Sequence, residues 1–327
     1  MFCSTIIPTI ARPTLSRSVH SVLNQELAAD DFEVIVVNDS GKPLPDADWL
    51  HTEHLRILDT ERRERCVARN AGAAIAKGRY LHFLDDDDWL LPGALQSFWQ
   101  LAQNSRAVWL YAGYNFVDWA GGILEEWHPD EAGNCLVRLV AAEWLPLQAS
   151  LIDAESFFAV GGFDPSFIPY QDNDLAMRIC MQGDVAVTMA VVANIVRCNE
   201  TSTTDYSLLS GNVKRSREKV LSMQGVFSRL RYSAANRPVA REYWQGRITA
   251  AYLISVVWNL RRGRYATAVS RGSHGLANVA LSGWRAVLPG FWRGVFRPHT
   301  THGFFCRYGI VRTSDLRRIV SRCSVPR

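Results

Sequence analysis

The sequence of 327 residues lacks the patterns that are typical of disulfide-stabilised, zinc-binding and membrane-spanning proteins. Its seven cysteines are scattered and odd in number, and no two of them have the C-x-x-C spacing of many zinc and redox sites. Such thiols do not form a disulfide framework, and they predict a reducing compartment. Residues 248–260 form an uncharged run of 13 residues, whereas a membrane-spanning helix needs about 20.

A secretory signal peptide is not expected either. Residues 1–13 contain no basic n-region, and Pro8 interrupts the apolar run early. Hydrophobic residues make up 48% of the chain and charged residues 21%, which is ordinary for a globular protein with a packed core. These features favour a cytoplasmic protein.

Acidic residues are scarce in the last part of the chain. Residues 205–327 contain 22 Lys and Arg but 4 Asp and Glu, a net charge of +18. Residues 1–204 contain 14 Lys and Arg and 28 Asp and Glu, a net charge of −14. This asymmetry predicts two domains, residues 1–204 and residues 205–327, that have different partners.

The C-terminal region mixes aromatic residues with arginines. Residues 283–296, GWRAVLPGFWRGVF, alternate the two, and residues 241–272 predict a helical hairpin that turns near Gly263. This composition, without a membrane-spanning run, is typical of a segment that lies on an anionic membrane surface. An ordinary helical region whose aromatic side chains pack inward is the alternative, and the sequence leaves both open. No nucleic-acid-binding motif accompanies the positive charge, so no nucleic-acid partner is expected.

Strand and helix patterns alternate over residues 2–102, and the strands are continuous apolar runs. This alternation indicates an α/β fold in which parallel strands form a central sheet with helices on both faces. Gly78 is expected to end the second helix. The expected strands cover residues 2–9, 32–41, 55–59 and 79–84, and the expected helices cover residues 13–25, 64–78 and 92–102.

The pattern changes after residue 107. Residues 108–127 predict two strands around a turn at residues 120–122. A strand and a short helix capped near Asp153 are expected next, followed by a Gly-rich loop. The last expected elements are a helix over residues 171–183, a β-rich run over residues 185–198 and a mainly helical region after residue 204.

Polar residues follow three of the expected strands where each strand ends. Thr9, Asn38 with Asp39, and the run from Asp85 to Asp88 occupy these positions. In α/β sheets, ligands bind beyond the carboxyl ends of parallel strands. The sequence therefore predicts that these side chains meet at one edge of the sheet.

Four consecutive aspartates follow an apolar strand in the stretch HFLDDDDWLLPG. Mg²⁺ uses one or two protein carboxylates and completes its shell with water and substrate phosphates. Asp85, Asp87 and Asp88 therefore indicate a metal site, and a diphosphate-bearing substrate would fit such a site. A polar loop that supplies negative charge to the next helix is the alternative, and four carboxylates favour the metal site. Within the four, Asp88 is expected only to begin the next helix.

Three other polar residues each have a functional and a structural interpretation. Asp39 ends the second strand, where it suits either a nucleoside contact or an Asx-turn. Arg69 lies in an apolar helix, where an arginine is costly unless it is paired. It either pairs with a phosphate or an Asp, or it lies on a solvated face of the helix. Asp172 suits a general base for a substrate hydroxyl or a helix N-cap, and locally the cap is favoured.

Four segments occur in a fixed order along the chain: STIIPTIARPTLSRSVHSVLNQ, FEVIVVNDSG, ARNAGAAIAKGRYLHFLDDDDWLLPGAL and GGFDPSFIPYQDNDLAMRI. Their order and spacing resemble those of family-2 glycosyltransferases. The ordered set is far more specific than any one motif, and it spans nearly all of the acidic region. The resemblance implies a GT-A fold, which is a Rossmann-like, mostly parallel sheet flanked by helices, and here a helical basic extension follows it.

The resemblance also implies roles for individual residues. Asp172 matches the acidic residue that deprotonates the acceptor hydroxyl in an inverting displacement. Asp87 matches the ligand of Mg²⁺ or Mn²⁺, and this cation bridges the diphosphate of the donor. The residues implied in nucleotide-sugar binding are Pro8, Thr9, Arg12, Asp39, Arg69, Asn70, Asp85 and Asp86.

Two positions depart from the pattern of the family. Gln171 stands where the family usually has Glu, and Asn199 stands where many members have a histidine near the nucleotide. A catalytically impaired protein that binds a nucleotide-sugar or a glycan is therefore the alternative to an enzyme.

The resemblance further implies the partners of the protein. The expected donor is a nucleotide-sugar, with a UDP-sugar as the commonest choice in the family. The expected acceptor is a glycan or a lipid-linked acceptor of cell-envelope polysaccharide synthesis. The basic residues 205–327 are expected to hold the protein at the cytoplasmic face of the membrane, where such acceptors lie.

Overall fold

The computed structural model divides into two compact units, and each is described by itself. Unit 1 comprises Met1–Cys135, Leu145–Ser166 and Asp174–Arg197, and unit 2 comprises Leu136–Trp144, Phe167–Asn173 and Cys198–Arg327. The domain boundary expected at residue 204 stays a prediction. The structure describes residues 1–61, 64–129, 132–136, 139, 144–197, 209–226, 229, 253, 256–257, 259–261 and 263–280.

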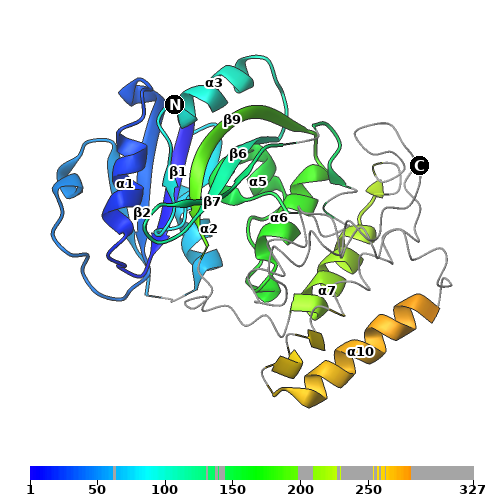
Figure 1. Ribbon diagram of the computed structural model, residues 1–327. Helices are drawn as coiled ribbons and strands as arrows, with labels where there is room; N and C mark the ends of the chain where they lie inside the picture. The colour runs from blue at the N-terminus through cyan, green and yellow to red at the C-terminus, as the bar shows by residue number, and fades with distance from the viewer. Residues whose placement is uncertain are drawn as a thin grey trace. The chain divides into compact units, whose positions relative to one another are not determined.

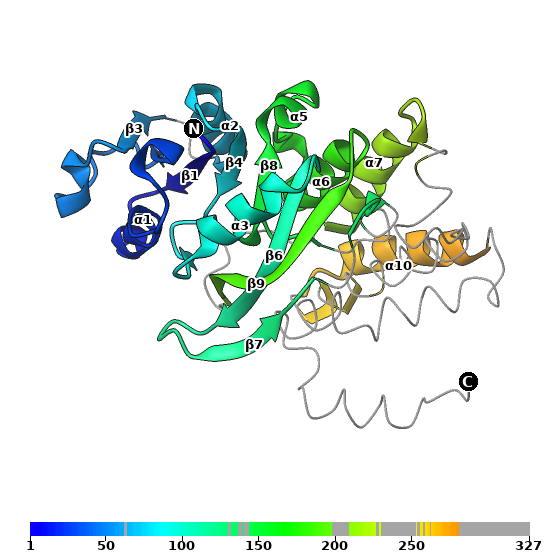
Figure 2. The ribbon, with the colours of Figure 1, turned by 90° about the horizontal axis from the view of Figure 1, so that it is seen from above.

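A sheet of nine strands, counted over the described residues, forms the centre of unit 1 (Figure 1). The order is β3-β2-β1-β4-β8-β6-β9-β5, and β7 pairs with β6. Figure 2 shows β6 and β9 side by side, in agreement with their parallel pairing. The strands are β1 (Cys3–Thr9), β2 (Phe32–Asn38), β3 (Leu55–Asp59), β4 (Tyr80–Phe83), β5 (Trp89–Leu90), β6 (Trp109–Val117), β7 (Ile123–Trp127), β8 (Ser150–Asp153) and β9 (Val185–Val196).

The strands β3, β2, β1 and β4 are parallel, as their apolar runs predict. In the register, Thr9 is opposite Asn38, and Asn38 is opposite Asp59, so these strands end at one edge. The other half of the sheet is mixed, because β8 is antiparallel to both β4 and β6 while β9 is parallel to β6. The predicted α/β fold is confirmed.

Helices cover the sheet with apolar side chains that recur at helical spacing. In α1, Leu15, Val19 and Val22 are buried, and burial of each such side chain contributes about 1.5–3 kcal/mol. α1 packs on β1 and β5, α2 on β1 and β2, and α3 on β6 and β9. The helices are α1 (Leu15–Leu23), α2 (Arg65–Ile75), α3 (Ala94–Gln103) and α5 (Ala154–Ala159). Helix α6 (Gln171–Cys180) belongs to unit 1 from Asp174 onward, and its first three residues belong to unit 2.

Helix α2 begins at a side-chain cap and ends earlier than expected. The Glu64 carboxylate accepts hydrogen bonds from the backbone N–H groups of Cys66 and Val67, which satisfies donors that a helix start leaves open. The helix ends at Ile75, so the expectation that Gly78 ends it is wrong. Gly78 is required for another reason, because a Cβ there would overlap the backbone of β1.

The aspartate run does not begin a helix. Strand β5 follows Asp88 directly and pairs with β9. Helix α3 begins only after Gly93, which has φ of 75°, and no side chain caps it. The expectation that Asp88 serves to start the next helix is therefore wrong. A two-residue strand bounded by Pro92 carries too weak a pattern to be predicted.

The remaining expected elements of unit 1 are confirmed. β6 and β7 form a hairpin in which the Asp118 carboxylate accepts hydrogen bonds from the N–H groups of Ala120 and Gly122. Asp153 caps α5 by accepting a hydrogen bond from the Ser156 N–H. β9 is the long strand expected after residue 184.

Unit 2 contains the helices α7 (Leu209–Leu221) and α10 (Tyr265–Ala280). The expected turn near Gly263 is confirmed. Gly263 has φ of 69°, its N–H donates to the Leu260 carbonyl, and the Arg264 N–H donates to the Asn259 carbonyl. These features form a Schellman motif, which ends one helical segment just before α10.

None of the helices in the described part of the chain is long and apolar enough to cross a membrane. The aromatic and arginine-rich segment 283–296 lies outside the described residues.

Candidate functional site

The four aspartates form a turn directly after β4, at the edge where the parallel strands end. The Asp88 N–H donates to the Asp85 carbonyl at 3.1 Å, and the Leu84 N–H donates to the Ile6 carbonyl of β1. Thr9, at the end of β1, contacts the turn as well. The predicted meeting of polar side chains at this edge is therefore confirmed for Thr9 and the aspartates.

Asp86 is anchored inside the protein. Its Oδ2 accepts a hydrogen bond from Thr9 Oγ1 at 2.6 Å, and its Oδ1 accepts one from Arg12 Nη1 at 3.0 Å. Burial raises the pKa of Asp86, although the Thr9 and Arg12 contacts oppose this. Thr9 and Arg12, both implied in nucleotide binding, thus fix the position of a carboxylate in the turn.

Asp85 forms the shortest ion pair described in the turn. Burial alone would raise its pKa, but the charge and hydrogen bond of Arg69, together with the charges of Arg65 and Arg12, outweigh this effect and lower the pKa. Arg69 Nη2 lies 2.5 Å from Asp85 Oδ1, and the Arg69 side chain is 3% exposed. The solvated-face interpretation of Arg69 is therefore wrong, and an Asp partner accounts for its burial in α2.

The charged forms of Asp87 and Asp88 are stabilised less well by the protein than that of Asp85. Burial, and next the charge of Asp85, raise the pKa of Asp87 to about 6, although Arg12 Nη1 lies 3.1 Å from its Oδ2. Burial and the neighbouring Asp87 raise the pKa of Asp88 well above its ordinary value. Asp88 Oδ1 accepts a hydrogen bond from the Val196 N–H at 2.7 Å.

The turn has the geometry of a divalent-cation site. One carboxylate oxygen each from Asp85, Asp87 and Asp88 lies within 4.8 Å of the others. The raised pKa values of Asp87 and Asp88 mean that their charged forms are disfavoured as they stand, and a nearby cation would stabilise them. Oxygen ligands of this type suit Mg²⁺ or Mn²⁺, so the residues present fit the predicted ion.

Asp39 links β2 to the start of α2. Its Oδ1 accepts a hydrogen bond from Thr60 Oγ1 at 2.7 Å, and its Oδ2 accepts one from the Glu64 N–H at 2.6 Å. The Asx-turn belongs to Asn38 instead, whose Oδ1 accepts a hydrogen bond from the Ser40 N–H. The Asx-turn interpretation of Asp39 is therefore wrong, and its role in nucleotide binding stays a prediction.

Asn70 fastens α2 to the Gly-rich loop. Its Nδ2 donates to the Phe163 carbonyl and its Oδ1 accepts from the Phe163 N–H, both at 2.9 Å. Gly162 has φ of 68°, and a Cβ there would meet Asn70 Oδ1. Pro8, half-buried within β1, lies one residue before Thr9. The implied nucleotide contacts of Asn70 and Pro8 stay predictions.

Asp172 is the second residue of α6 and is half-buried in unit 2. It therefore lies in the first helical turn, whereas an N-cap precedes that turn. Gln171 beside it is buried. Asp174 is fully buried in an ion pair with Arg178, at 2.7 Å. Asn199 lies outside the described residues.

Gln148 belongs to the site although no motif in the sequence indicates it. This residue lies in the 3-10 turn Leu147–Ala149 before β8, and its Nε2 donates to Asp85 Oδ2 at 3.0 Å. Its backbone carbonyl lies 3.1 Å from Nε2 of the buried His82, and His82 Nδ1 lies 3.2 Å from Thr5 Oγ1. Burial lowers the pKa of His82 to about 4. A neutral His82 with its proton on Nε2 thus donates to Gln148.

Comparison with known proteins places the chain in a family. The sequence profile of Glycosyl transferase family 2 matches residues 4–171, about half of the chain. An uncharacterized glycosyltransferase of Methanocaldococcus jannaschii is 25% identical over 189 residues, which are 55% of this chain and 65% of that protein. The poly(ribitol-phosphate) β-N-acetylglucosaminyltransferase TarP of Staphylococcus aureus is 29% identical over 163 residues. This match covers 48% of the chain and 46% of TarP, so the chain spans less than two thirds of either relative.

Solved structures of S. aureus TarS share the architecture. The structure of TarS 1–349 in complex with UDP-GlcNAc matches with a TM-score of 0.57 and 13% identity, over 84% of this chain and 91% of that one. The complex with UDP matches with a TM-score of 0.55 and 14% identity, over 87% of this chain and 93% of that one. At this identity the likeness shows the GT-A fold alone. Because the family profile covers β1, the aspartate turn and the loop up to Gln171, the chain belongs to glycosyl transferase family 2.

Proposed function

We propose that the protein is a metal-dependent, inverting glycosyltransferase. It would move a sugar from a nucleotide-sugar, a UDP-sugar, to a hydroxyl group of a glycan or a lipid-linked acceptor. The observation that carries this proposal is the half-buried aspartate turn, with one oxygen each of Asp85, Asp87 and Asp88 within 4.8 Å of the others, in a chain of this family. The UDP-GlcNAc bound in the TarS structure supports the choice of donor.

The residues of unit 1 would bind and orient the donor. When bound at Asp87 with Asp85 or Asp88, Mg²⁺ or Mn²⁺ supplies positive charge that stabilises the diphosphate leaving group. The Arg69–Asp85 and Arg12–Asp86 pairs hold the turn in place. Gln148 donates a hydrogen bond to the second oxygen of Asp85, which restrains the rotation of this carboxylate.

Asp172 would act as the general base. Its carboxylate accepts the proton of the acceptor hydroxyl while the acceptor oxygen bonds to the anomeric carbon. The bond from that carbon to the diphosphate oxygen breaks, and its electron pair leaves with the diphosphate. One displacement from the opposite face inverts the configuration and needs no protein nucleophile. Asp172 is half-buried, which leaves part of the side chain accessible for this role.

Turnover of a donor panel tests the proposal against the alternative of a non-catalytic binding protein, which Gln171 and Asn199 motivate. UDP- and GDP-sugars are incubated with Mn²⁺ and mixed glycan acceptors, and released nucleoside diphosphate is measured. We expect UDP release from one UDP-sugar well above the release without protein. UDP binding by calorimetry without release from any donor would favour the binding protein.

We further propose that the C-terminal region holds the protein at the anionic, cytoplasmic face of the membrane. Tyr265, Val269 and Leu276 of α10 are 68%, 71% and 64% exposed, and they recur at i, i+4 and i+11, on one helix face. Residues 205–327 carry 22 Lys and Arg against 4 Asp and Glu. Apolar residues on a helix in a basic region fit the surface of an anionic bilayer.

Vesicle binding tests this second proposal. We expect the protein to co-sediment with phosphatidylcholine vesicles that contain phosphatidylserine, and expect salt to weaken this binding because it screens surface charge. Val269→Asp should reduce the bound fraction, whereas Asp46→Asn, at an exposed position of unit 1, should not. Equal recovery with vesicles that lack phosphatidylserine would contradict the proposal.

A further inference from the structure

Helix α7 holds the segment that leads into α6. Asn212 of α7 is 3% exposed, and its Nδ2 donates to the backbone carbonyls of Ile168 and Pro169, both at 2.9 Å. Its Oδ1 accepts a hydrogen bond from Arg215 Nη2 at 2.6 Å. Because the oxygen faces a donor and the nitrogen faces two acceptors, the orientation of the amide is fixed. All of these residues belong to unit 2.

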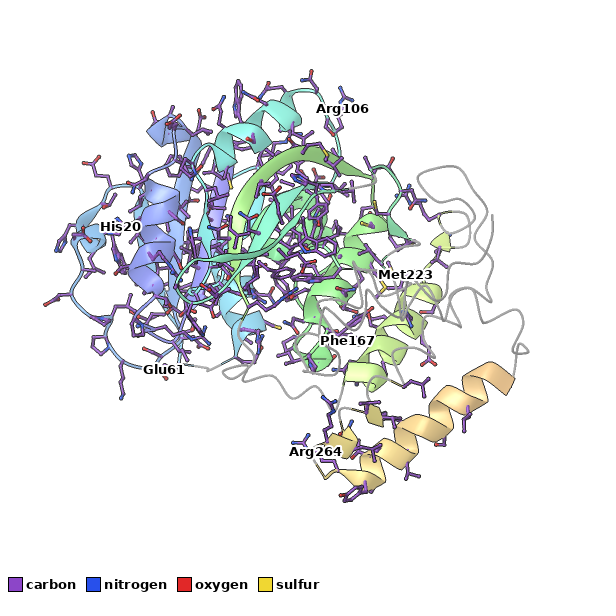
Figure 3. All side chains as sticks on the ribbon, viewed as in Figure 1. His20, Glu61, Arg106, Phe167, Met223 and Arg264 are labelled. Carbon is purple, nitrogen blue, oxygen red and sulfur yellow. The ribbon has the colours of Figure 1, made fainter. Side chains whose placement is uncertain are left out.

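Two cationic side chains of α7 contact the start of the same segment. Phe167, labelled in Figure 3, is buried. The Cζ atom of Arg215 lies 5.4 Å from the centroid of its ring, and the Nζ atom of Lys219 lies 5.0 Å from it. Cations at these distances are attracted to an aromatic face. Helix α7 therefore contacts residues 167, 168 and 169 in succession.

The residue that follows these contacts has an unusual backbone conformation. Tyr170 has φ of 108°, which residues with a side chain rarely adopt. Such a conformation persists only where the surrounding structure holds it. The carbonyls bound by Asn212 directly precede Tyr170, and Asp172 follows two residues later. The contacts to α7 thus restrain the backbone from which the helix carrying Asp172 begins.

We infer that Asn212 is a positioning residue for Asp172, and that helix α7 thereby takes part in catalysis. The inference rests on the proposed function, in which Asp172 accepts the proton of the acceptor. A catalytic group that is misplaced by about 1 Å can cost about 100-fold in rate. The residues proposed to bind the nucleotide lie in unit 1. Loss of the Asn212 contacts should therefore reduce turnover and leave nucleotide affinity unchanged.

Asn212→Leu keeps the approximate size of the side chain and removes its hydrogen bonds. We expect kcat to fall by about 10- to 100-fold, with the Kd for UDP within about twofold of the wild-type value. Hydrogen exchange of the backbone amides in residues 166–172 should become at least about tenfold faster. Asn212→Asp keeps an oxygen toward Arg215 but loses the donor. It should show the same fall in kcat, the same Kd for UDP and the same faster exchange.

Val220→Ala is the matched control, because Val220 is also buried on α7 but its side chain cannot form a hydrogen bond. It should lower the unfolding midpoint and leave kcat and the exchange of residues 166–172 unchanged. Unchanged hydrogen exchange of residues 166–172 in both Asn212 variants would show that Asn212 does not restrain this segment. Faster exchange with unchanged kcat, or an equal fall in kcat in Val220→Ala, would overturn the positioning role.

The failure of the proposed function has a different signature. Wild-type protein would then release no nucleotide from any donor, while hydrogen exchange would still decide whether Asn212 holds residues 166–172.

Discussion

Asp172→Asn should lower the rate of sugar transfer by about 10²- to 10⁴-fold, the range in which a general base contributes to catalysis. The substitution preserves the size of the side chain, but a carboxamide does not accept a proton at neutral pH. In the proposed mechanism Asp172 contacts the acceptor hydroxyl, whereas other residues bind the nucleotide. We therefore expect the Kd for UDP to stay unchanged. Initial rates of UDP release and calorimetric titration with UDP measure the two effects.

The control for this variant is Asp46→Asn, which makes the same chemical change at an exposed position. It should have the activity of the wild type. Transfer by Asp172→Asn at the wild-type rate would show that another group removes the proton. A large loss of UDP affinity in the variant would show instead that Asp172 serves binding.

Asp87→Asn should have the second large effect, a loss of about 100-fold or more in transfer rate. A bound metal ion supplies several kcal/mol of charge stabilisation to the transition state, and each 1.36 kcal/mol corresponds to about tenfold in rate. The carboxamide oxygen introduced at this position would still accept a hydrogen bond from Arg12, which now lies 3.1 Å from Asp87 Oδ2, so the turn should keep its conformation. Rates are measured over a range of Mn²⁺ concentrations.

The dependence on Mn²⁺ separates metal binding from structural damage. We expect Asp87→Asn to need a higher Mn²⁺ concentration for half-maximal rate, with a thermal unfolding midpoint close to that of the wild type. If the transfer rates of both proteins depend on Mn²⁺ concentration in the same way, Asp87 is not a ligand of the metal. Asp85 and Asp88 would then be the carboxylates to test. Asp46→Asn again serves as the control.

The sequence predicts the parallel half of the sheet well, because burial on both faces leaves a strong local signal. β1 and β2 are continuous apolar runs, and the polar residues that follow them fall at one edge by register. Local signals fail where a residue serves a distant contact. Gly78 looks like a helix stop, but it allows the backbone to approach β1, which depends on strand pairing across the sheet.

The candidate site was predictable only in part, for the same reason. The aspartate run is visible as four adjacent charges, and two of its partners can be anticipated. An Asp or phosphate partner is one expectation for Arg69, 16 residues from Asp85, and the family resemblance implies Arg12 in nucleotide-sugar binding. Gln148, 63 residues from Asp85, has no such signal. Asn212 lies 44 residues from Ile168, in a region whose composition indicates only a basic helix. Such contacts depend on how the elements pack, and no spacing rule within one sequence encodes them.

The most direct test of the central claim is the rate of UDP release from the preferred UDP-sugar before and after removal of divalent cations with EDTA. The proposed function predicts steady release with Mn²⁺, loss of release after EDTA, and recovery when Mn²⁺ is restored. Release that is insensitive to EDTA would contradict the metal dependence. If the protein binds UDP but releases UDP from none of the donors, the proposal that it catalyses sugar transfer would be contradicted.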